Sequence, residues 1–172
     1  MGDAKRKKMA AATWQHRSNQ ARPKFSAEDI DAATSEWTRR SSQQTRAEFD
    51  RALAEQPFLM TYIVAPYMRS GGVRKELAQI ALDVFMLCIQ LMHNASLHWP
   101  AVDEETFVRV GFRGAHSDTE SLLEPGLLAY LGLRLRTVTG LPRDDQEATV
   151  ANAIFAIVYC CAEAAAQAPS SH

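Results

Sequence analysis

Two of the residue types that bind zinc recur at regular spacing in the middle of this sequence. Cys88, His93 and His98 follow one another at intervals of five residues, and thiolate and imidazole are common zinc ligands. Five residues of α-helix, however, turn a side chain by about 140°, so the three would point in different directions. The spaced motifs CxxC, HExxH and HxxxH do not occur in the sequence. We therefore expect core or rim residues here, with no metal site and no cofactor.

A second group places the residue types of a catalytic triad side by side. His116, Ser117 and Asp118 are consecutive, but adjacent residues rarely converge in space as a triad requires. Ser117 or Asp118 more simply caps a following helix. Cys160 and Cys161 stand in an apolar stretch, where a thiol is normally inert packing. These residues predict no catalytic nucleophile.

Acidic residues give a third candidate, for acid–base chemistry. The acids at 103–105 and 144–145 each stand where a helix is expected to begin, and helix starts favour acids electrostatically. Asp83 lies in an otherwise apolar stretch, so its burial would require an arginine or a backbone donor. We expect a structural salt bridge at Asp83. An enzyme whose site combines Asp83, His93 and an arginine is the alternative.

Four arginines could form a patch that binds an anion or a partner: Arg109, Arg113, Arg134 and Arg136. If the two segments that carry them pair as strands, all four share one face. If the segments are helices, Arg109 and Arg113 share a face at i, i+4 and the other two diverge. We favour helices, and with them a solvated face.

The N-terminal segment is strongly basic. Residues 1–24 hold seven of the 19 lysines and arginines but one of the 20 acids, so a basic arm precedes an acidic body. Flexible arms of this kind bind phosphate backbones by releasing counterions, and they also dock on acidic protein surfaces. The residues expected to bind a partner protein or nucleic acid are Lys5, Arg6, Lys7, Lys8, Trp14, Arg17, Arg22 and Lys24.

Length and composition indicate one intracellular helical domain behind this arm. The 172 residues suffice for a single core, and a hydrophobic share of 47% excludes a wholly disordered chain. Alanine and leucine, both good helix formers, outnumber the β-branched valine and isoleucine. No uninterrupted apolar run approaches the roughly 18 residues of a membrane span. Three cysteines, two of them adjacent, favour a reducing, cytoplasmic compartment.

Helical spacing predicts the elements that must position these groups. The clearest run covers 73–94 and is apolar nearly all round, as expected for a central buried helix. Capping patterns predict a helix over 26–40 and another that starts at Thr45. The apolar segment 58–68 predicts a short buried helix, and 148–168 predicts a long final one.

Two segments fit a helix and a strand equally well by periodicity. Residues 106–113 and 131–139 each contain a short alternation of apolar and polar side chains. Composition favours helix in both, with a small β-hairpin within 106–139 as the alternative. The fold prediction is all-α: an arm over 1–24, flexible unless bound, and a single compact domain over 25–172 with five to seven helices.

Three functions are compatible with this reading. The first is a non-enzymatic interaction protein, an adaptor or a stoichiometric inhibitor or regulator, that binds another protein through helix faces and the basic arm. The second is a nucleic-acid-associated protein anchored by residues 1–24. The third is an enzyme with a site not visible as a motif. The apolar 58–68 segment and the alanine-rich last helix could each form a homodimer interface or belong to the core.

Overall fold

The described part of the chain is helical throughout its regular structure. The computed structural model describes residues 24–69, 71–116 and 124–168, with the backbone alone for 112–116. Within these ranges there are seven α-helices, one π-helical segment and no strand, which confirms the predicted all-α domain. In chain order they are α2 (Ala27–Thr38), α3 (Ser42–Glu55), η1 (Leu59–Val64), α4 (Ala65–Arg69), α5 (Lys75–Asn94), α6 (Glu104–His116), α7 (Pro125–Arg136) and α8 (Asp145–Gln167).

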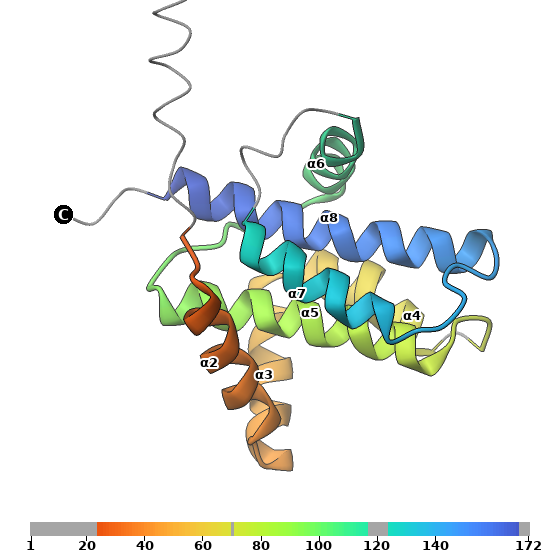
Figure 1. The fold of residues 1–172 in the computed structure, drawn as a ribbon. Helices are drawn as coiled ribbons and strands as arrows, with labels where there is room; N and C mark the ends of the chain where they lie inside the picture. Colours follow the sequence, from red (N-terminus) through yellow and green to blue (C-terminus); the bar gives the residue numbers. More distant parts are fainter. Residues whose placement is uncertain (1–23, 70, 117–123, 169–172) are drawn as a thin grey trace, which may run out of the picture.

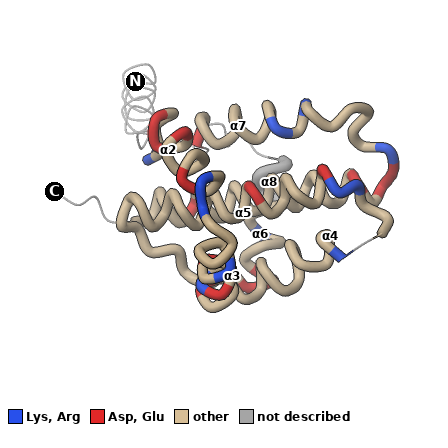
Figure 2. The backbone as a smooth tube through the Cα atoms, turned by 90° about the horizontal axis from the view of Figure 1, so that it is seen from below, with Lys and Arg blue, Asp and Glu red and all other residues tan. Residues whose placement is uncertain are grey.

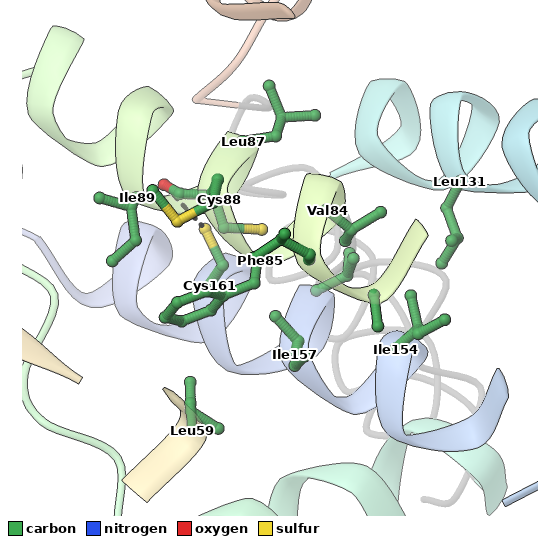
Figure 3. Close-up of a cluster of buried hydrophobic side chains, with 14 of the residues drawn as sticks. Leu59, Val84, Phe85, Leu87, Cys88, Ile89, Leu131, Ile154, Ile157 and Cys161 are labelled. Atoms are coloured by element: carbon green, nitrogen blue, oxygen red, sulfur yellow. Dashed lines mark hydrogen bonds between the residues drawn. The ribbon is translucent and has the colours of Figure 1, made fainter. Parts of the chain in front are cut away.

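Helix α5 lies at the centre of the fold and runs parallel to α8 (Figure 1). Fourteen of its 20 residues are buried, which confirms the predicted central helix. Residues at equivalent positions along the two helices face each other. Arg74, beside the start of α5, binds Glu147, and further along Cys88 contacts Cys161, with the partners 73 residues apart in both pairs. Side chains from both helices form the core together with Leu59 and Leu131 (Figure 3).

The remaining helices cover this pair from several sides. Helix α6 packs on α8, whereas α2, η1, α4 and α7 pack on α5. Helices α5 and α8 are long and apolar enough to cross a membrane, by length and composition alone. In this fold, 78% and 56% of their most apolar stretches are buried against other parts of the protein.

The predicted cap at Ser117 or Asp118 lies outside the described residues; elsewhere, helix starts follow the predicted caps at three of four places. Ser26 caps α2 with Asp29, Asp103 accepts a hydrogen bond from the backbone of Thr106, and Asp144 caps α8. The predicted start of α3 at Thr45 is wrong. Ser41 is the cap, because its hydroxyl accepts a hydrogen bond from the backbone N–H of Gln44. The Gln44 side chain in turn accepts a hydrogen bond from the backbone N–H of Ser41.

The alternative β-hairpin within 106–139 is wrong, because the described residues of this segment form α6 and α7. Strand-like alternation would place Val108 and Val110 on one face, but they are 56% and 6% exposed. In α7, Leu131 is fully buried and Leu133 is 66% exposed. The helical period governs both segments because each packs one face on the central helices.

The segment 58–68 is helical as predicted but only partly buried. Leu59 faces the core, whereas Tyr62 is 67% exposed. Its first part is a π-helix, whose backbone N–H groups reach the carbonyl five residues earlier. Pro66 accounts for the wider turn, because its ring lacks an N–H and would collide with the carbonyl four residues before it in an α-helix.

Candidate functional site

The basic arm joins the domain at a buried carboxylate. The backbone N–H of Lys24 donates to Oε1 of Glu124 at 2.7 Å, and that of Phe25 donates to Oε2 at 3.1 Å. Glu124 is 5% exposed and stands at the start of α7. Its two oxygens therefore fix the direction in which the chain leaves the domain. Nothing in the sequence signalled this role, because the partners are about a hundred residues apart.

Lys24 is the one predicted arm contact inside the described residues. The others lie outside them: Lys5, Arg6, Lys7, Lys8, Trp14, Arg17 and Arg22. The chain enters the domain near the end of α8 (Figure 1), next to the acidic first turn of α2 with Glu28 and Asp29 (Figure 2). Hydrogen bonds from Ser26 lower the pKa of Asp29, so this turn keeps its negative charge.

The predicted arginine patch is divided between separate ion pairs. Arg134 of α7 binds Asp83 of α5, with Nη2 2.5 Å from Oδ2. Arg109 of α6 pairs with Glu163 of α8 at 3.4 Å. Arg136 is exposed at the end of α7, and the Arg113 side chain lies outside the described residues.

Asp83 has the arginine partner that its position required. Its side chain is 16% exposed and also accepts a hydrogen bond from Gln79 at 2.8 Å. The structural salt bridge predicted from the sequence is confirmed. His93 stands ten residues further along the same helix, a separation of about 15 Å. Asp83 and His93 therefore do not converge on one site.

The three cysteines are buried free thiols. Burial raises the pKa of Cys160 to about 12. The pKa of Cys161 is also raised, first by a hydrogen bond with the Cys88 side chain and then by burial. Its Sγ also donates to the Cys88 carbonyl at 4.0 Å (Figure 3). A thiol with a raised pKa stays protonated at neutral pH and is a poor nucleophile. These side chains pack as small apolar groups, as the sequence predicted.

One acid at the start of α8 is fully buried among arginines. Glu147 accepts from Arg74 Nε at 2.7 Å and Nη2 at 2.8 Å, and from Arg143 Nε at 2.8 Å and its backbone N–H at 2.9 Å. The hydrogen bonds from Arg74, with those from Arg143, hold the pKa of Glu147 at about 2 against the opposing effect of burial. Arg74 also donates to the Thr139 carbonyl at 2.7 Å. The cluster joins the starts of α5 and α8 to the loop between α7 and α8.

Two cavities flank the loop 96–102 at the opposite end of the α5–α8 pair. The first, of about 580 Å³, lies between this loop, α6 and the last two turns of α8, and we call it the α8 cavity. The second, of about 470 Å³, lies between the loop, the end of α3 and the end of α5, and we call it the α3 cavity. Four residues line both: Leu97, His98, Trp99 and Ala101.

Trp99 combines burial with an unused hydrogen-bond donor. Its side chain packs against Phe85, with ring centroids 6.4 Å apart, and the residue is 7% exposed. Its indole Nε1 has no hydrogen-bond partner among the described residues. A buried donor left unpaired costs about 1–3 kcal/mol.

The backbone of the same loop is firmly held by Gln56. This residue is fully buried, and its amide nitrogen donates to the carbonyls of Trp99 at 3.1 Å and Pro100 at 3.0 Å. Its amide oxygen accepts from the N–H of Val102 at 2.9 Å. Ser96, where the loop begins, adopts φ 54°, a left-handed conformation that favours glycine. The cavities are therefore bounded by a pinned loop.

Two polar side chains of the α3 cavity, Glu55 and His93, are already paired with each other. His93 Nε2 lies 2.8 Å from Glu55 Oε2, and His93 Nδ1 lies 3.5 Å from Arg51 Nη1. Because arginine only donates, Nδ1 is the acceptor and Nε2–H donates to Glu55. Both ring nitrogens are thus engaged. His98 also lines this cavity.

The regularly spaced residues Cys88, His93 and His98 do not come together as metal ligands. Cys88 is fully buried in the core, whereas His93 is engaged by Glu55. Among the described residues, no group of three histidine, cysteine, aspartate or glutamate side chains is arranged to hold a metal ion. No family model, no curated protein and no solved structure matches this chain. Its function must be argued from the side chains described above.

Proposed function

We propose that this protein is a non-enzymatic interaction protein, an adaptor or stoichiometric inhibitor that binds another protein through its helical domain and its basic arm. The observation that carries the proposal is the clamp of Glu124 on the backbone of Lys24 and Phe25. A buried carboxylate with two backbone donors fixes the root of a charged segment. Lys24, the last residue of the arm, therefore stands at a fixed place on the domain.

That place is the end of the α5–α8 pair where the loop 96–102 lies. Figure 1 shows the chain entering near the end of α8, and the last two turns of α8 line the α8 cavity. The arm therefore begins at this end of the domain. Charges of one sign on an arm accelerate the encounter with an oppositely charged partner, and salt screens this attraction beyond about 10 Å at 0.1 M ionic strength.

The groups that could have carried catalysis support a non-enzymatic role. Asp83 and Glu147 are engaged by arginines, so neither is a free acid or base. The thiol of Cys160, which lines the α8 cavity, has a pKa raised to about 12 by burial. These side chains stabilise the fold.

The test uses the full chain and a matched pair of charge variants. In the arm variant, Lys5, Arg6, Lys7 and Lys8 become glutamine. In the control variant, four exposed bases of the body become glutamine: Arg39, Arg46, Arg69 and Lys75. Each protein is used to capture partners from a nuclease-treated lysate of the source cells at low and high salt. We expect one protein partner to be retained by the wild type and the control, and to be lost at high salt and from the arm variant. Equal retention by both variants would contradict the role of the arm.

Nucleic acid is the second candidate partner, because seven basic residues crowd the arm. The same proteins are titrated against labelled single- and double-stranded nucleic acid and followed by fluorescence anisotropy at two salt concentrations. If about five bases meet phosphates, log K falls with log salt at a slope of about −4 to −5. No binding by the wild type at low salt would exclude this candidate.

A further inference from the structure

Arg51 of α3 is shared between two acceptors that lie on different helices. Its Nη1 lies 3.5 Å from Nδ1 of His93 on α5 and 3.5 Å from Oε2 of Glu48, one turn earlier on α3. Hydrogen bonds from N–H groups are normally about 2.9–3.0 Å long, so both contacts are stretched. The Arg51 side chain is 51% exposed and has room to move. Its guanidinium therefore stands between two positions and fully occupies neither.

The position at Glu48 offers an acceptor that is not in use. The Glu48 side chain is 14% exposed, and its Oε2 is buried without a hydrogen-bond partner in the described part of the chain. A buried acceptor that lacks a hydrogen bond destabilises the fold. An approach of Nη1 by about 0.5 Å would turn the present contact into a hydrogen bond of normal length. Arg51 therefore gains a hydrogen bond when it moves from His93 to Glu48.

The position at His93 exists only while the imidazole is neutral. Nδ1 then accepts from Arg51, and Nε2 donates to Oε2 of Glu55 at 2.8 Å. A ring that takes up a proton carries a donor on both nitrogens, and arginine has no acceptor to offer. The contact between Arg51 and His93 is then replaced by repulsion between two cations. The contact with Glu55 persists as a charge-assisted hydrogen bond.

We propose that His93 is a pH-sensitive switch that moves Arg51 between two helices. When His93 is neutral, Arg51 binds its Nδ1 and links α3 to α5. When His93 is charged, Arg51 binds Oε2 of Glu48 within α3. Histidine is the side chain that ordinarily changes its charge between about pH 5 and pH 8. The switch does not depend on the proposed partner protein or on the basic arm.

Two further titratable groups lie near the ring without touching it. His98 of the loop 96–102 lines the α3 cavity together with His93. Glu36 of α2 reaches Asn94, the next residue of α5, at 3.5 Å. Within the described residues, neither makes a hydrogen bond or an ion pair with the His93 imidazole. His98 therefore serves as an internal reference for the switch.

The two charged groups that do contact the ring act on its charge in opposite directions. Glu55 stabilises the protonated ring of His93 through the 2.8 Å contact. Arg51 disfavours the protonated ring, because its own positive charge lies 3.5 Å from Nδ1. Removing the charge of Arg51 should therefore let His93 take up its proton at a higher pH.

The first experiment follows the side-chain nitrogens of the full chain from about pH 8 to about pH 5. A long-range proton–nitrogen correlation spectrum reports which ring nitrogens carry a proton. At the upper pH we expect a proton on Nε2 of His93 and none on Nδ1, and at the lower pH a proton on each. The guanidinium signals of Arg51 should move in step with this change, and its through-space contacts to the His93 ring should disappear.

Variants test the two positions of Arg51 separately. Glu48→Leu removes the second acceptor, so in acid the guanidinium signals of Arg51 should resemble those of an exposed arginine. Arg51→Met keeps an unbranched side chain without the charge and should move the titration of His93 to higher pH, with that of His98 unchanged. Arg46→Met, at an exposed arginine of the same helix, is the control and should leave both titrations as in the wild type.

Three results would overturn the proposal: a proton on Nδ1 of His93 at the upper pH, Arg51 signals that do not follow the titration of His93, or equal titration shifts in Arg51→Met and Arg46→Met. Arg51 signals in acid that are the same in Glu48→Leu as in the wild type would also count against it, because Glu48 would then not receive the guanidinium. The first two results need only the wild type, so they decide the matter even if a substitution prevents folding.

Discussion

The two ends of the α5–α8 pair differ in how their polar groups are used. At the end where both helices begin, Glu147 is fully buried and all its contacts go to Arg74, Arg143 and the backbone. At the end where both helices finish, two cavities flank a loop, and the indole donor of Trp99 has no partner among the described residues. We call these the closed end and the open end.

The comparison teaches that charge density alone does not mark a binding site. The closed end is charged, and its charges include the arginine and aspartates where α7 leads into α8 (Figure 2). Glu147, Arg74 and Arg143 pair with one another, so these charges connect helices and are not free for a ligand. The open end has looser pairs, such as Arg109–Glu163 at 3.4 Å, and space beside them. Unused hydrogen-bonding capacity next to a cavity distinguishes it.

The largest expected effect comes from the same substitution made at each end. Glu147→Gln removes the buried negative charge that Arg74 and Arg143 share, so the two guanidinium groups would repel each other across a neutral amide. We expect a large fall in the urea midpoint of unfolding. Glu163→Gln at the open end breaks an exposed pair and should cost less than about 1 kcal/mol. Equal falls for the two variants would remove the distinction between the ends.

Acid should weaken the closed end by the same mechanism. The pKa of Glu147 is about 2 in the folded protein and 4.5 is its ordinary value. A depressed pKa contributes stability that is complete above about pH 4.5 and is lost as the pH falls toward 2. Urea unfolding between pH 6 and pH 2 should therefore show a decline that is smaller in Glu147→Gln. A parallel decline in both proteins would assign the acid sensitivity to other groups.

Gln56 tests how the open end keeps its shape. Gln56→Ala removes three hydrogen bonds to the loop and leaves a small void, at a cost of about 2–4 kcal/mol. Gln43→Ala, an exposed glutamine of the same helix, should change stability by less than about 0.5 kcal/mol. Chemical denaturation of the two variants measures the difference. If they lose the same amount, the loop is held by its other contacts.

The smallest effect is expected at the first residue of the loop. Ser96 has φ 54°, where glycine is less strained, so Ser96→Gly should stabilise the protein by about 0.5–1 kcal/mol. Ser35→Gly inside α2 is expected to change the free energy of unfolding in the opposite direction. It should destabilise the protein by about 0.5 kcal/mol, because glycine has a lower helix propensity than serine. Thermal unfolding of the pair shows whether the backbone conformation sets the sign. A loss of stability in Ser96→Gly would mean that the serine side chain matters more than the strain.

Much of the fold was predictable because helix formation is governed by neighbours in sequence. The apolar spacing over 73–94 predicted α5, and the caps at Ser26, Asp103 and Asp144 predicted three helix starts. The ambiguous segment 106–113 shows the limit of this reasoning. A short alternation fits two periods, and only packing against α8 chose one.

The candidate site was not predictable in the same way. The sequence pointed to the basic arm, to Arg109 and to Arg134, but not to Trp99, Gln56 or Glu124. Trp99 matters because its donor is unpaired, and that is a property of its surroundings. No spacing in the sequence could have revealed the unpaired donor of Trp99. The role of Gln56 was hidden for another reason, because it binds loop residues that lie 43–46 positions further along the chain.

The sequence by itself determined the all-α class, the central helix and the basic arm on an acidic body. These depend on composition and on side chains within a few residues of each other, where local periodicity and capping act. The tertiary structure alone decided which charges are closed in pairs and where a cavity remains. Glu124 meets Lys24 and Phe25 across 100 and 99 residues, and Glu147 meets Arg74 across 73 residues. Such contacts arise from how the helices pack, because packing sets which distant side chains come within hydrogen-bonding reach.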